Sequence, residues 1–464
     1  GKILSNFLLL RYLKKIFYNS VAELRKDKKV LKSSIEREQN EVACSAECEK
    51  IKGSKNLNVP HLRFPEFSEE WEICKVSELL DFYSTNSLSW EQLEYGTKAI
   101  MNLHYGLIHV GLPTMVDLTR DNLPNIKEDN MPKNFELCKE GDVAFADASE
   151  DTNEVAKPIE FFDLAGKNIV CGLHTIHGRD NKNKTVIGFK GYAFSSSTFH
   201  NQIRRIAQGT KIYSISTKNF SECFIGIPSK VEQTKIATLL RLIDERIATQ
   251  NKIIEDLKKL KSAIIENVFS NCHYDKLRLG DIGSYIRGLT YNSNDVIDYN
   301  GTLVMRSNNI VNGCLLDYSN NVVTVNKQIS QEQQLQDGDV IICMANGSSA
   351  LIGKSSFYDG KCLYPITVGA FCGIYRSKMP ITKWLFQTNR YRRYIWNSLQ
   401  GGNGAIANLN SEDILRMSFS LPDKSKTERY TKLLSSIDSL IATNVTLSSK
   451  FSHQKKYLLR WMFI

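Results

Sequence analysis

Two segments of the chain repeat each other at a constant offset of 194 residues, and this internal repeat limits the possible folds more than any other feature. The first copy begins at Ile227-Pro228 and the second at Leu421-Pro422, and no gap is needed between there and the matched pair Phe269 and Phe463. A repeat of this length indicates two similar structural units rather than one continuous core.

Apolar residues recur within each copy at alternating steps of four and three, which is the heptad spacing of a coiled-coil seam. A proline precedes each run, as is typical of a turn that leads into a helix. Gln250 and Asn444 are matching polar seam residues, which either fix the register of the seam or face solvent, and the sequence leaves both readings open. The predicted seam consists of Ile236, Leu240, Ile243, Ile247, Gln250, Ile254, Leu257 and Ile264, with Leu434, Ile437, Ile441, Asn444, Phe451 and Leu458 in the second copy.

The regions before each helix resemble each other more loosely. Gly141-Asp142-Val143 matches Gly338-Asp339-Val340, and each precedes an apolar run, a pattern that predicts a turn followed by a buried strand. The predicted class is α+β, with two similar domains that share a scaffold but not a surface. The predicted boundaries are 58–226 and 272–420 for the domains, 227–271 and 421–464 for the repeated helices, and 1–57 for a basic helical extension of unknown role.

Composition excludes several classes of protein. The net charge of +10 is a weak indication of an anionic partner, and residues 1–57 alone hold 13 of the 60 basic residues against 7 of the 50 acidic ones. No apolar run approaches the roughly 18 residues that span a bilayer, and no secretory signal is recognisable. The 11 cysteines include no C-x-x-C pair, which indicates reduced thiols in a cytoplasm and no metal site.

Motifs of catalysis are missing from the sequence. There is no Pro-Pro pair, so the Asn/Asp-Pro-Pro-aromatic motif of amino-methyltransferases cannot be present. The segment from Gly347 to Ser355 approaches a phosphate-binding loop, but five residues separate its glycines where the motif has four. The sequence therefore favours a binding protein without catalytic residues and without a cofactor of its own.

The stretch Val59-Pro60-His61-Leu62-Arg63-Phe64-Pro65-Glu66-Phe67, followed by Trp71, resembles the opening of the specificity subunit of type I restriction–modification systems. The Gly-Asp-Val turns, the Ile-Pro and Leu-Pro junctions, and the alternation of variable and repeated regions are similar to the same family. The resemblance covers residues 59–464.

The resemblance implies two target recognition domains, each of which reads one half-site of a bipartite double-stranded DNA target. It implies that the two long helices pair as an antiparallel coiled coil, relate the domains by a pseudo-twofold axis and dock two methyltransferase subunits. S-adenosylmethionine and ATP would bind to partner subunits, namely the methyltransferases and the motor-nuclease subunits. The alternative is a stand-alone DNA-binding or scaffold protein whose coiled coil pairs with a second copy.

Reading of DNA bases requires side chains that offer donors and acceptors to base edges, whereas basic side chains hold phosphates. Arg306, Ser307, Asn308 and Asn309 follow a predicted strand in the second domain and form its best candidate cluster, with Arg376 and Asn403 in support. The candidates in the first domain are Lys98, Asn102, His104 and Tyr105 for bases, with Arg179, Lys182 and Lys184 for phosphates.

Overall fold

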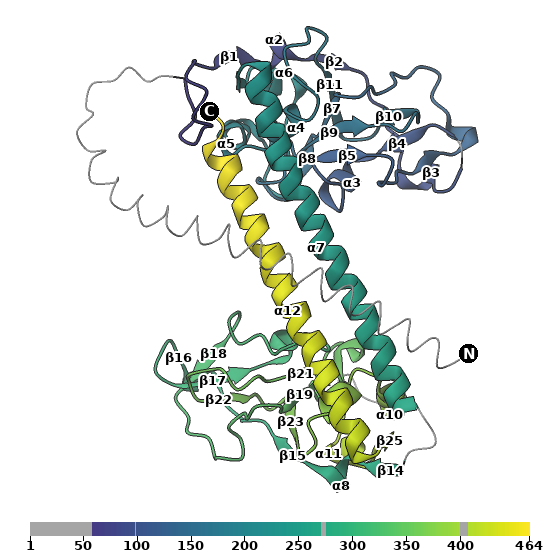
Figure 1. Ribbon diagram of the computed structural model, residues 1–464, viewed down its shortest axis with the longest axis vertical. Coiled ribbons are helices and arrows are strands. Elements are labelled where there is room, and N and C mark those ends of the chain that lie inside the picture. The colour runs from purple at the N-terminus through teal and green to yellow at the C-terminus, as the bar shows by residue number, and fades with distance from the viewer. Residues whose placement is uncertain (1–57, 98, 271–274, 400–406) are drawn as a thin grey trace, which may run out of the picture. The chain divides into compact units, whose positions relative to one another are not determined.

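The computed structural model describes residues 58–97, 99–270, 275–399 and 407–464 (Figure 1). The proposed extension 1–57 and the candidate DNA contacts Lys98 and Asn403 lie outside these residues. The chain divides into two compact units, the first ending at Ala237 and including Leu459–Ile464, the second spanning Thr238–Leu458. Both units mix helices with strands, in agreement with the predicted α+β class.

The first domain, residues 58–227 of the first unit, is built on a five-stranded sheet of order β2-β11-β7-β9-β5 and a four-stranded sheet of order β10-β4-β6-β3. Two short pairs, β1-β13 and β12-β8, complete it. Its strands are β1 (Glu72–Lys75), β2 (Asp81–Tyr83), β3 (Leu93–Glu94), β4 (Met101–Leu103), β5 (Met115–Asp117), β6 (Asn125–Ile126), β7 (Val143–Ala146), β8 (Ala148–Ser149), β9 (Pro158–Asp163), β10 (Ile169–Cys171), β11 (Thr175–Arg179), β12 (Tyr213–Ser214) and β13 (Phe224–Ile227). Its helices are α2 (Val76–Leu79), α3 (Tyr105–His109), α4 (Lys190–Phe194), α5 (Ser197–Ile206) and α6 (Thr217–Ser221), with the 3₁₀ turns η2 (Trp90–Gln92) and η3 (Glu128–Asn130).

The second domain, residues 275–421 of the second unit, has two four-stranded sheets of order β15-β23-β19-β21 and β16-β18-β17-β22, and the pairs β14-β25 and β20-β24. Its strands are β14 (Asp275–Arg278), β15 (Gly283–Arg287), β16 (Val296–Ile297), β17 (Thr302–Met305), β18 (Val323–Val325), β19 (Val340–Cys343), β20 (Ala345–Asn346), β21 (Ser355–Phe357), β22 (Ile366–Val368), β23 (Cys372–Ser377), β24 (Ala407–Asn408) and β25 (Ser418–Leu421). Its helices are α8 (Leu279–Ile282), α9 (Thr382–Leu385), α10 (Asn389–Leu399) and α11 (Ser411–Arg416), with the 3₁₀ turns η4 (Ser293–Asp295), η5 (Ser307–Asn309) and η6 (Ser349–Leu351).

The sheets of the two domains correspond strand for strand, apart from β5, which extends the larger sheet of the first domain. In both domains the predicted Gly-Asp-Val turn leads into a central strand, β7 or β19, whose four residues are all buried. The turn glycines, Gly141 and Gly338, each have a φ of +84°, a left-handed conformation that favours glycine. The same short sequence therefore builds the same structural element twice.

The two repeated segments are long helices, α7 (Lys230–Ser270) and α12 (Lys424–Trp461). Ser229 Oγ accepts the backbone N–H of Glu232 at 3.4 Å, and Asp423 Oδ1 accepts that of Lys426 at 3.0 Å. Ser and Asp are favoured N-cap residues because a side-chain oxygen satisfies an N–H that the first helical turn leaves unpaired. No helix of the described ranges is both long and apolar enough to cross a membrane.

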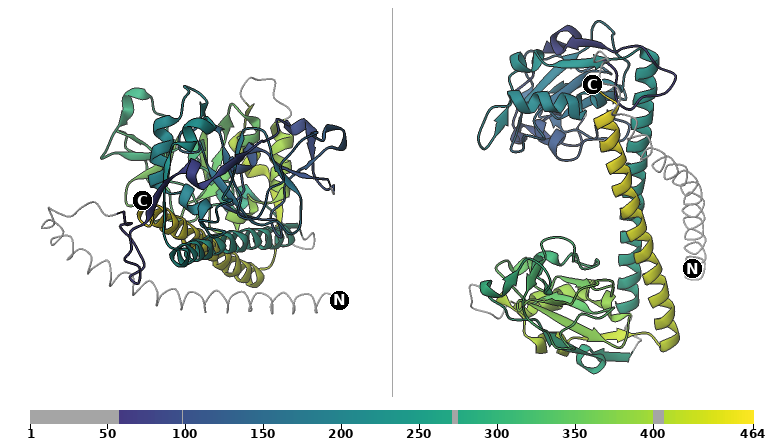
Figure 2. Two further views of the ribbon diagram at one scale, coloured as in Figure 1. Left: turned by 90° about the horizontal axis from the view of Figure 1, so that it is seen from above. Right: turned by 90° about the vertical axis from the view of Figure 1, so that its left-hand side faces the viewer.

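Within the second unit, α7 and α12 lie side by side and antiparallel (Figures 1 and 2). Lys261 contacts Asp438, Asn251 contacts Ser448 and Asp244 contacts Lys455. Residue numbers therefore fall along α7 as they rise along α12, in equal steps. This register is the one expected of two copies of one helix packed in opposite directions.

Most of the predicted seam residues are buried. The exceptions are Ile247, Ile441 and Phe451, which are half-buried. The matching polar residues Gln250 and Asn444 are only 4% and 6% exposed, so neither faces solvent. Asn444 Nδ2 donates to the carbonyl of Leu440 at 2.7 Å.

The last residues of α12 and the chain terminus belong to the first unit. The ring of Phe463 packs edge-on against Trp71 at 6.2 Å, and the backbone N–H of Leu62 donates to the carbonyl of Trp461 at 2.8 Å. Phe269, the repeat mate of Phe463, packs on Phe419 at 6.1 Å in the second domain. Trp71, which follows the Val59–Phe67 stretch, therefore contacts Phe463 at the end of the second repeat copy.

Candidate nucleic-acid interface

Each domain presents an edge at which equivalent strands end and the chain turns into loops. Strands β4 and β10 run parallel, as do β17 and β22, and their registers match residue for residue. We define the strand-end edge by residues of the loops that follow these strands and the central strand. It comprises His104, Tyr105, Asp147 and His174 in the first domain and Arg306, Ser307, Met344 and Phe371 in the second.

Matching hydrogen bonds show that these positions are equivalent. The backbone N–H of Gly172 donates to Leu103 O at 2.9 Å, and that of Gly369 donates to Met305 O at 2.8 Å. The N–H of Asp147 donates to His174 O at 3.0 Å, just as that of Met344 donates to Phe371 O at 2.9 Å. His104 therefore occupies the place of Arg306, and His174 that of Phe371. His104 and Arg306 are both candidates predicted from the sequence. They occupy equivalent positions in the two domains.

The edge of the first domain is a run of rings in contact, of which the last pair, Tyr105 and His174, meets edge-on. The ring of Trp90 lies 4.4 Å from that of His104, which lies 4.7 Å from Tyr105, which in turn lies 5.2 Å from His174. His174 Nδ1 is 3.1 Å from Asp147 Oδ1. Burial and the nearby His174 lower the pKa of His104, whereas burial raises the pKa of Asp147. This edge offers flat π-faces and imidazole groups rather than fixed positive charge.

The edge of the second domain borders a cavity of about 590 Å³. Arg306 is exposed beside it, and its guanidinium donates to the carbonyl of Asn321 at 3.2 Å. Phe371 is 70% exposed, although phenylalanine is usually buried. The cavity is lined by Leu289, Tyr291, Asn292, Ser293, Arg306, Ser307, Ala345, Asn346, Gly347, Gly369, Ala370, Phe371 and Cys372.

Two of the proposed base-reading residues support these loops from inside. Asn102 is fully buried and donates to Asn86 Oδ1 at 3.0 Å. Asn309 is 1% exposed, accepts the backbone N–H of Arg306 at 2.9 Å and donates to two loop carbonyls. Their side chains therefore do not face a ligand. Asn308 is exposed, and Ser307 lines the cavity.

Arg179 and Arg376 are structural, in contrast to the DNA contacts that the sequence suggested. Arg179 donates through Nε and Nη2 to both oxygens of Asp142 at 2.9 and 2.8 Å. Arg376 makes the same bidentate contact with Asp339, through Nε at 2.8 Å and Nη2 at 2.6 Å. Each aspartate is 1% exposed and belongs to the Gly-Asp-Val turn of its domain. A buried carboxylate needs such a partner, and this need explains why the arginine recurs.

The pair in the first domain has a third member, His177, whose Nε2 lies 2.7 Å from Asp142 Oδ2. Burial opposes ionisation of Asp142, but the hydrogen bonds from His177 and Arg179 outweigh it and lower the pKa of this carboxyl group. Burial likewise opposes the charged form of His177, whereas the bond to Asp142 and the neighbouring Cys171 raise the pKa of the imidazole. Asp142 is therefore a fixed negative charge inside the domain.

Lys182 and Lys184 lie beyond the carboxyl end of β11, whereas His174 precedes its start. Lys182 Nζ donates to the carbonyl of Glu78 at 2.8 Å, and Lys184 Nζ forms an ion pair with Glu72 at 2.6 Å. The structure thus places both lysines at the opposite end of the strand from the strand-end edge. It does not bring them together with His104 and Tyr105.

Several residues at the edge or in contact with it were not predicted from the sequence, among them Trp90, His174, Tyr291 and Phe371. A signal for two of them was present, because His174 and Phe371 each lie two residues after the matching glycines Gly172 and Gly369. No comparable signal marks Trp90 or Tyr291, since loops of different sequence deliver their rings to the edge.

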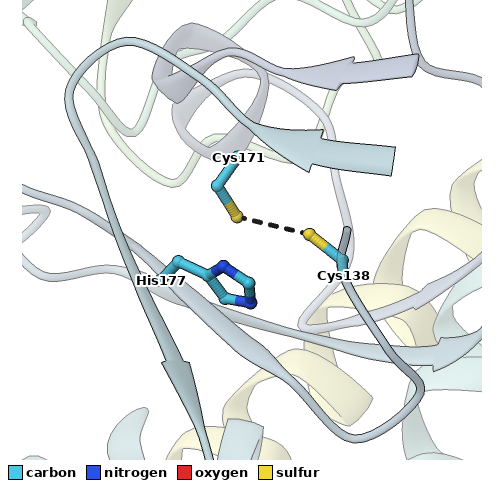
Figure 3. A group of neighbouring side chains, drawn as sticks. All are labelled: Cys138, Cys171 and His177. Carbon is cyan, nitrogen blue, oxygen red and sulfur yellow. Dashed lines mark hydrogen bonds between the residues drawn. The ribbon is translucent and has the colours of Figure 1, made fainter. Parts of the chain in front are cut away.

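Three donors in the first domain could hold a metal ion, namely Cys138, Cys171 and His177 (Figure 3). The sequence predicted no metal site, because none of these residues lies in a recognised ligand spacing. The donors come from a loop and two separate strands, and folding alone brings them together.

Comparisons with known proteins agree on one family. The family model of the type I restriction modification DNA specificity domain matches residues 272–450. The chain is 27% identical over 169 residues to the EcoKI specificity subunit of Escherichia coli K12, a match covering 34% of this chain and 35% of the relative. It is 24% identical over 235 residues to a putative specificity subunit, MjaX, of Methanocaldococcus jannaschii, covering 49% and 53%.

Among solved structures, the S subunit of a type I restriction–modification system from M. genitalium has the same fold, with a TM-score of 0.55 and 16% identity. That match covers 88% of this chain and 99% of the other. The matched segments span about a third to a half of the length of the curated relatives. Residues 272–450 match the DNA specificity domain of type I restriction–modification systems, and the chain is similar to their specificity subunits.

Proposed function

We propose that this chain is the sequence-reading subunit of a type I restriction–modification complex and that each domain reads one half of a bipartite DNA target. The observation that carries the proposal is the duplicated strand-end edge. Backbone hydrogen bonds at the edge recur in both domains, whereas the side chains differ, with His104 in one and Arg306 in the other. Two domains with the same backbone at this edge but different side chains can recognise two different DNA sequences.

The second domain has the more direct chemistry for base recognition. An exposed arginine beside a cavity can offer two parallel N–H groups to the O6 and N7 atoms of guanine. Asn346 and Ser307 add amide and hydroxyl groups, and Phe371 offers an apolar surface to a sugar or a thymine methyl group. In the first domain His104, Tyr105 and His174 would serve, since imidazole and phenol groups both donate and accept hydrogen bonds.

We expect the helices α7 and α12 to form an antiparallel coiled coil that relates the two recognition domains and docks two methyltransferase subunits. Their pairing within one chain supports this arrangement over a helix that pairs with a second copy, because two ion pairs and a hydrogen bond already join the two helices to each other. Catalysis would belong to partner subunits, with S-adenosylmethionine on the methyltransferases and ATP on the motor-nuclease subunits.

The test is co-expression of the chain with its candidate methyltransferase subunit, followed by sequencing of methylated bases in the host DNA. The expected result is adenine methylation within a motif of two short blocks separated by an unread spacer. A continuous motif, or no methylation from a complex that assembles, would overturn the proposal. Omission of the chain is the control, and it should abolish sequence-specific methylation.

A further inference from the structure

We propose that Cys138, Cys171 and His177 form a buried binding site for a thiophilic metal ion, Zn²⁺ or Cu⁺, within the first domain. The two sulfur atoms are 3.6 Å apart, and one donor atom from each of the three residues lies within 4.8 Å of the other two (Figure 3). All three residues are buried. The site is independent of the proposed DNA-reading function, since it rests on none of the strand-end residues.

The orientation of His177 is the feature that a core of idle thiols does not explain. Its Nε2 is committed to Asp142 Oδ2 at 2.7 Å, an arrangement that fixes the ring. Its Nδ1 is buried and has no hydrogen-bond partner among the described residues. In Figure 3 the ring lies directly beside the two sulfur atoms. An unpaired buried nitrogen is costly, and a metal ion would use its lone pair.

Asp142 supplies the outer support that metal-binding histidines usually have. A ligating imidazole commonly donates its other N–H to a carboxylate, which fixes the tautomer and increases the basicity of the ligand nitrogen. Asp142 is itself held by Arg179 at 2.8 Å and by the backbone N–H of Lys139 at 2.9 Å. The ligand ring is therefore positioned before any ion arrives.

The equivalent positions of the second domain show that the fold does not require these three residues. Cys171 and Val368 both end their strands beside the matched residues Leu103 and Met305. The backbone of Cys138 donates to Ile169, as that of Leu335 donates to Ile366, and His177 corresponds to Ile374 across the central strand. Leu335, Val368 and Ile374 are all buried in one apolar core. The donor set is thus specific to the first domain.

The backbone around the donors is rigid. His177 lies in β11, where it pairs with Ala144 on one side and Tyr83 on the other. Cys171 is the last residue of β10, which pairs with β4. The backbone N–H of Cys138 donates to the carbonyl of Ile169, also in β10, at 2.8 Å. Ligands held by sheet strands need little rearrangement to bind an ion.

Donor type limits the choice of ion. Thiolate and imidazole ligands select Zn²⁺ and Cu⁺ over Mg²⁺ and Ca²⁺, which prefer oxygen. Three donors complete the shell of Cu⁺, whereas Zn²⁺ would take a water molecule as its fourth ligand. On binding, each thiol loses its proton to solvent, as does Nδ1 of His177 where the imidazole is protonated. The two sulfur atoms and Nδ1 then each donate an electron pair to the ion, so binding releases protons.

The test uses the full chain in its methyltransferase complex, purified under reducing conditions without chelator, with metal content measured by elemental analysis. Zn²⁺ and Cu⁺ are then added separately to metal-stripped protein, and Co²⁺ serves as a spectroscopic probe of thiolate ligation. The expected result is about one ion per chain with one of the two metals, and a thiolate-to-cobalt charge-transfer band. Thermal unfolding of the loaded protein should occur several degrees higher.

The informative variant is the triple substitution Cys138→Leu, Cys171→Val and His177→Ile, which installs the residues that the second domain already accommodates. It should fold and lose both the bound ion and the cobalt band. Cys223→Ala, which changes a buried cysteine outside the cluster, should keep both. Equal metal content in the wild-type and triple-variant proteins would overturn the proposal, as would wild-type protein that binds neither ion when its thiols are reduced.

Discussion

Lys261 Nζ lies 2.7 Å from Asp438 Oδ1 and joins α7 to α12. Lys455 and Asp244 form the same ion pair at 2.7 Å in the opposite direction. Residue 438 follows residue 244, and residue 455 follows residue 261, by the 194-residue offset of the repeat. One ion pair has therefore been built twice, and the two copies fix the register of the helices at two points along their contact.

Loss of Lys261 should destabilise the second unit more than loss of Lys455. Lys261→Met removes the cation from the carboxylate of Asp438, whose side chain is 18% exposed and which keeps its hydrogen bond from Trp384 Nε1 at 2.9 Å. The Lys455–Asp244 pair is more exposed, at 18% and 22% against 9% and 18%. We expect a cost of about 2–4 kcal/mol for Lys261→Met and about 1 kcal/mol for Lys455→Met, measured by urea unfolding.

The double variant Lys261→Met with Asp438→Asn is the matched control, because it removes both the lysine and the carboxylate charge that would otherwise be left unpaired. It should recover part of the loss. A double variant as unstable as the sum of the single ones would mean that the pair contributes nothing as a pair.

Arg179→Met and Arg376→Met should each act on stability and not on phosphate binding. Arg376→Met leaves Asp339, which is 1% exposed, without its cation, at a cost of about 3–5 kcal/mol. Asp142 keeps its hydrogen bond with His177 Nε2, so Arg179→Met should cost less. Chemical unfolding should detect this loss. The salt dependence of DNA binding should stay the same, whereas removal of a true phosphate contact would lower its slope by about one. A reduced salt dependence of DNA binding with unchanged stability would show instead that these arginines contact phosphates.

The parts of the fold that were predictable are those whose sequence occurs in both copies of the repeat. The repeat and its heptads located α7 and α12 within three residues of their observed ends, and the Gly-Asp-Val turns located the central strands β7 and β19. The pairing order of the sheets was not predictable, since it depends on contacts between segments that are far apart and share no motif. β5, for example, pairs with β9 across more than 40 residues of chain.

The candidate interface was harder to predict because surface and interior use the same residue types. Asn102 and Asn309 have the chemistry of base readers, yet both hold loops from inside. Arg179 and Arg376 were separated from their aspartates by 37 residues, so sequence alone could not reveal that each was already paired. Arg306 was found because it follows a predicted strand, a signal that was not recognised before His104.

The first domain should lose stability below about pH 6.5 through His104. The folded-state pKa of His104 is lowered, so the unfolded chain binds the proton more readily and folding is weakened as the pH falls. Protonation also blocks Nδ1, which accepts the backbone N–H of Gly106 at 3.2 Å and caps α3. His104→Asn keeps a capping acceptor without a titrating group. Thermal unfolding at about pH 7.5 and about pH 5.5 should show a smaller drop for this variant than for the wild type. Equal drops would exclude His104 as the group responsible.

Arg306→Ala should change one half of the DNA target and leave the other intact. The guanidinium is exposed at the cavity of the second domain, and loss of a two-pronged base contact costs about 1–3 kcal/mol of binding and relaxes specificity at one position. Sequencing of methylated sites should therefore show one degenerate base in a single block. Lys378→Ala, at the opposite end of β23 from Phe371, is the control and should leave the motif unchanged. Since His104 is the equivalent position of the first domain, His104→Ala should alter the other block. If Arg306→Ala and His104→Ala relaxed the same block, the domains would not read separate half-sites.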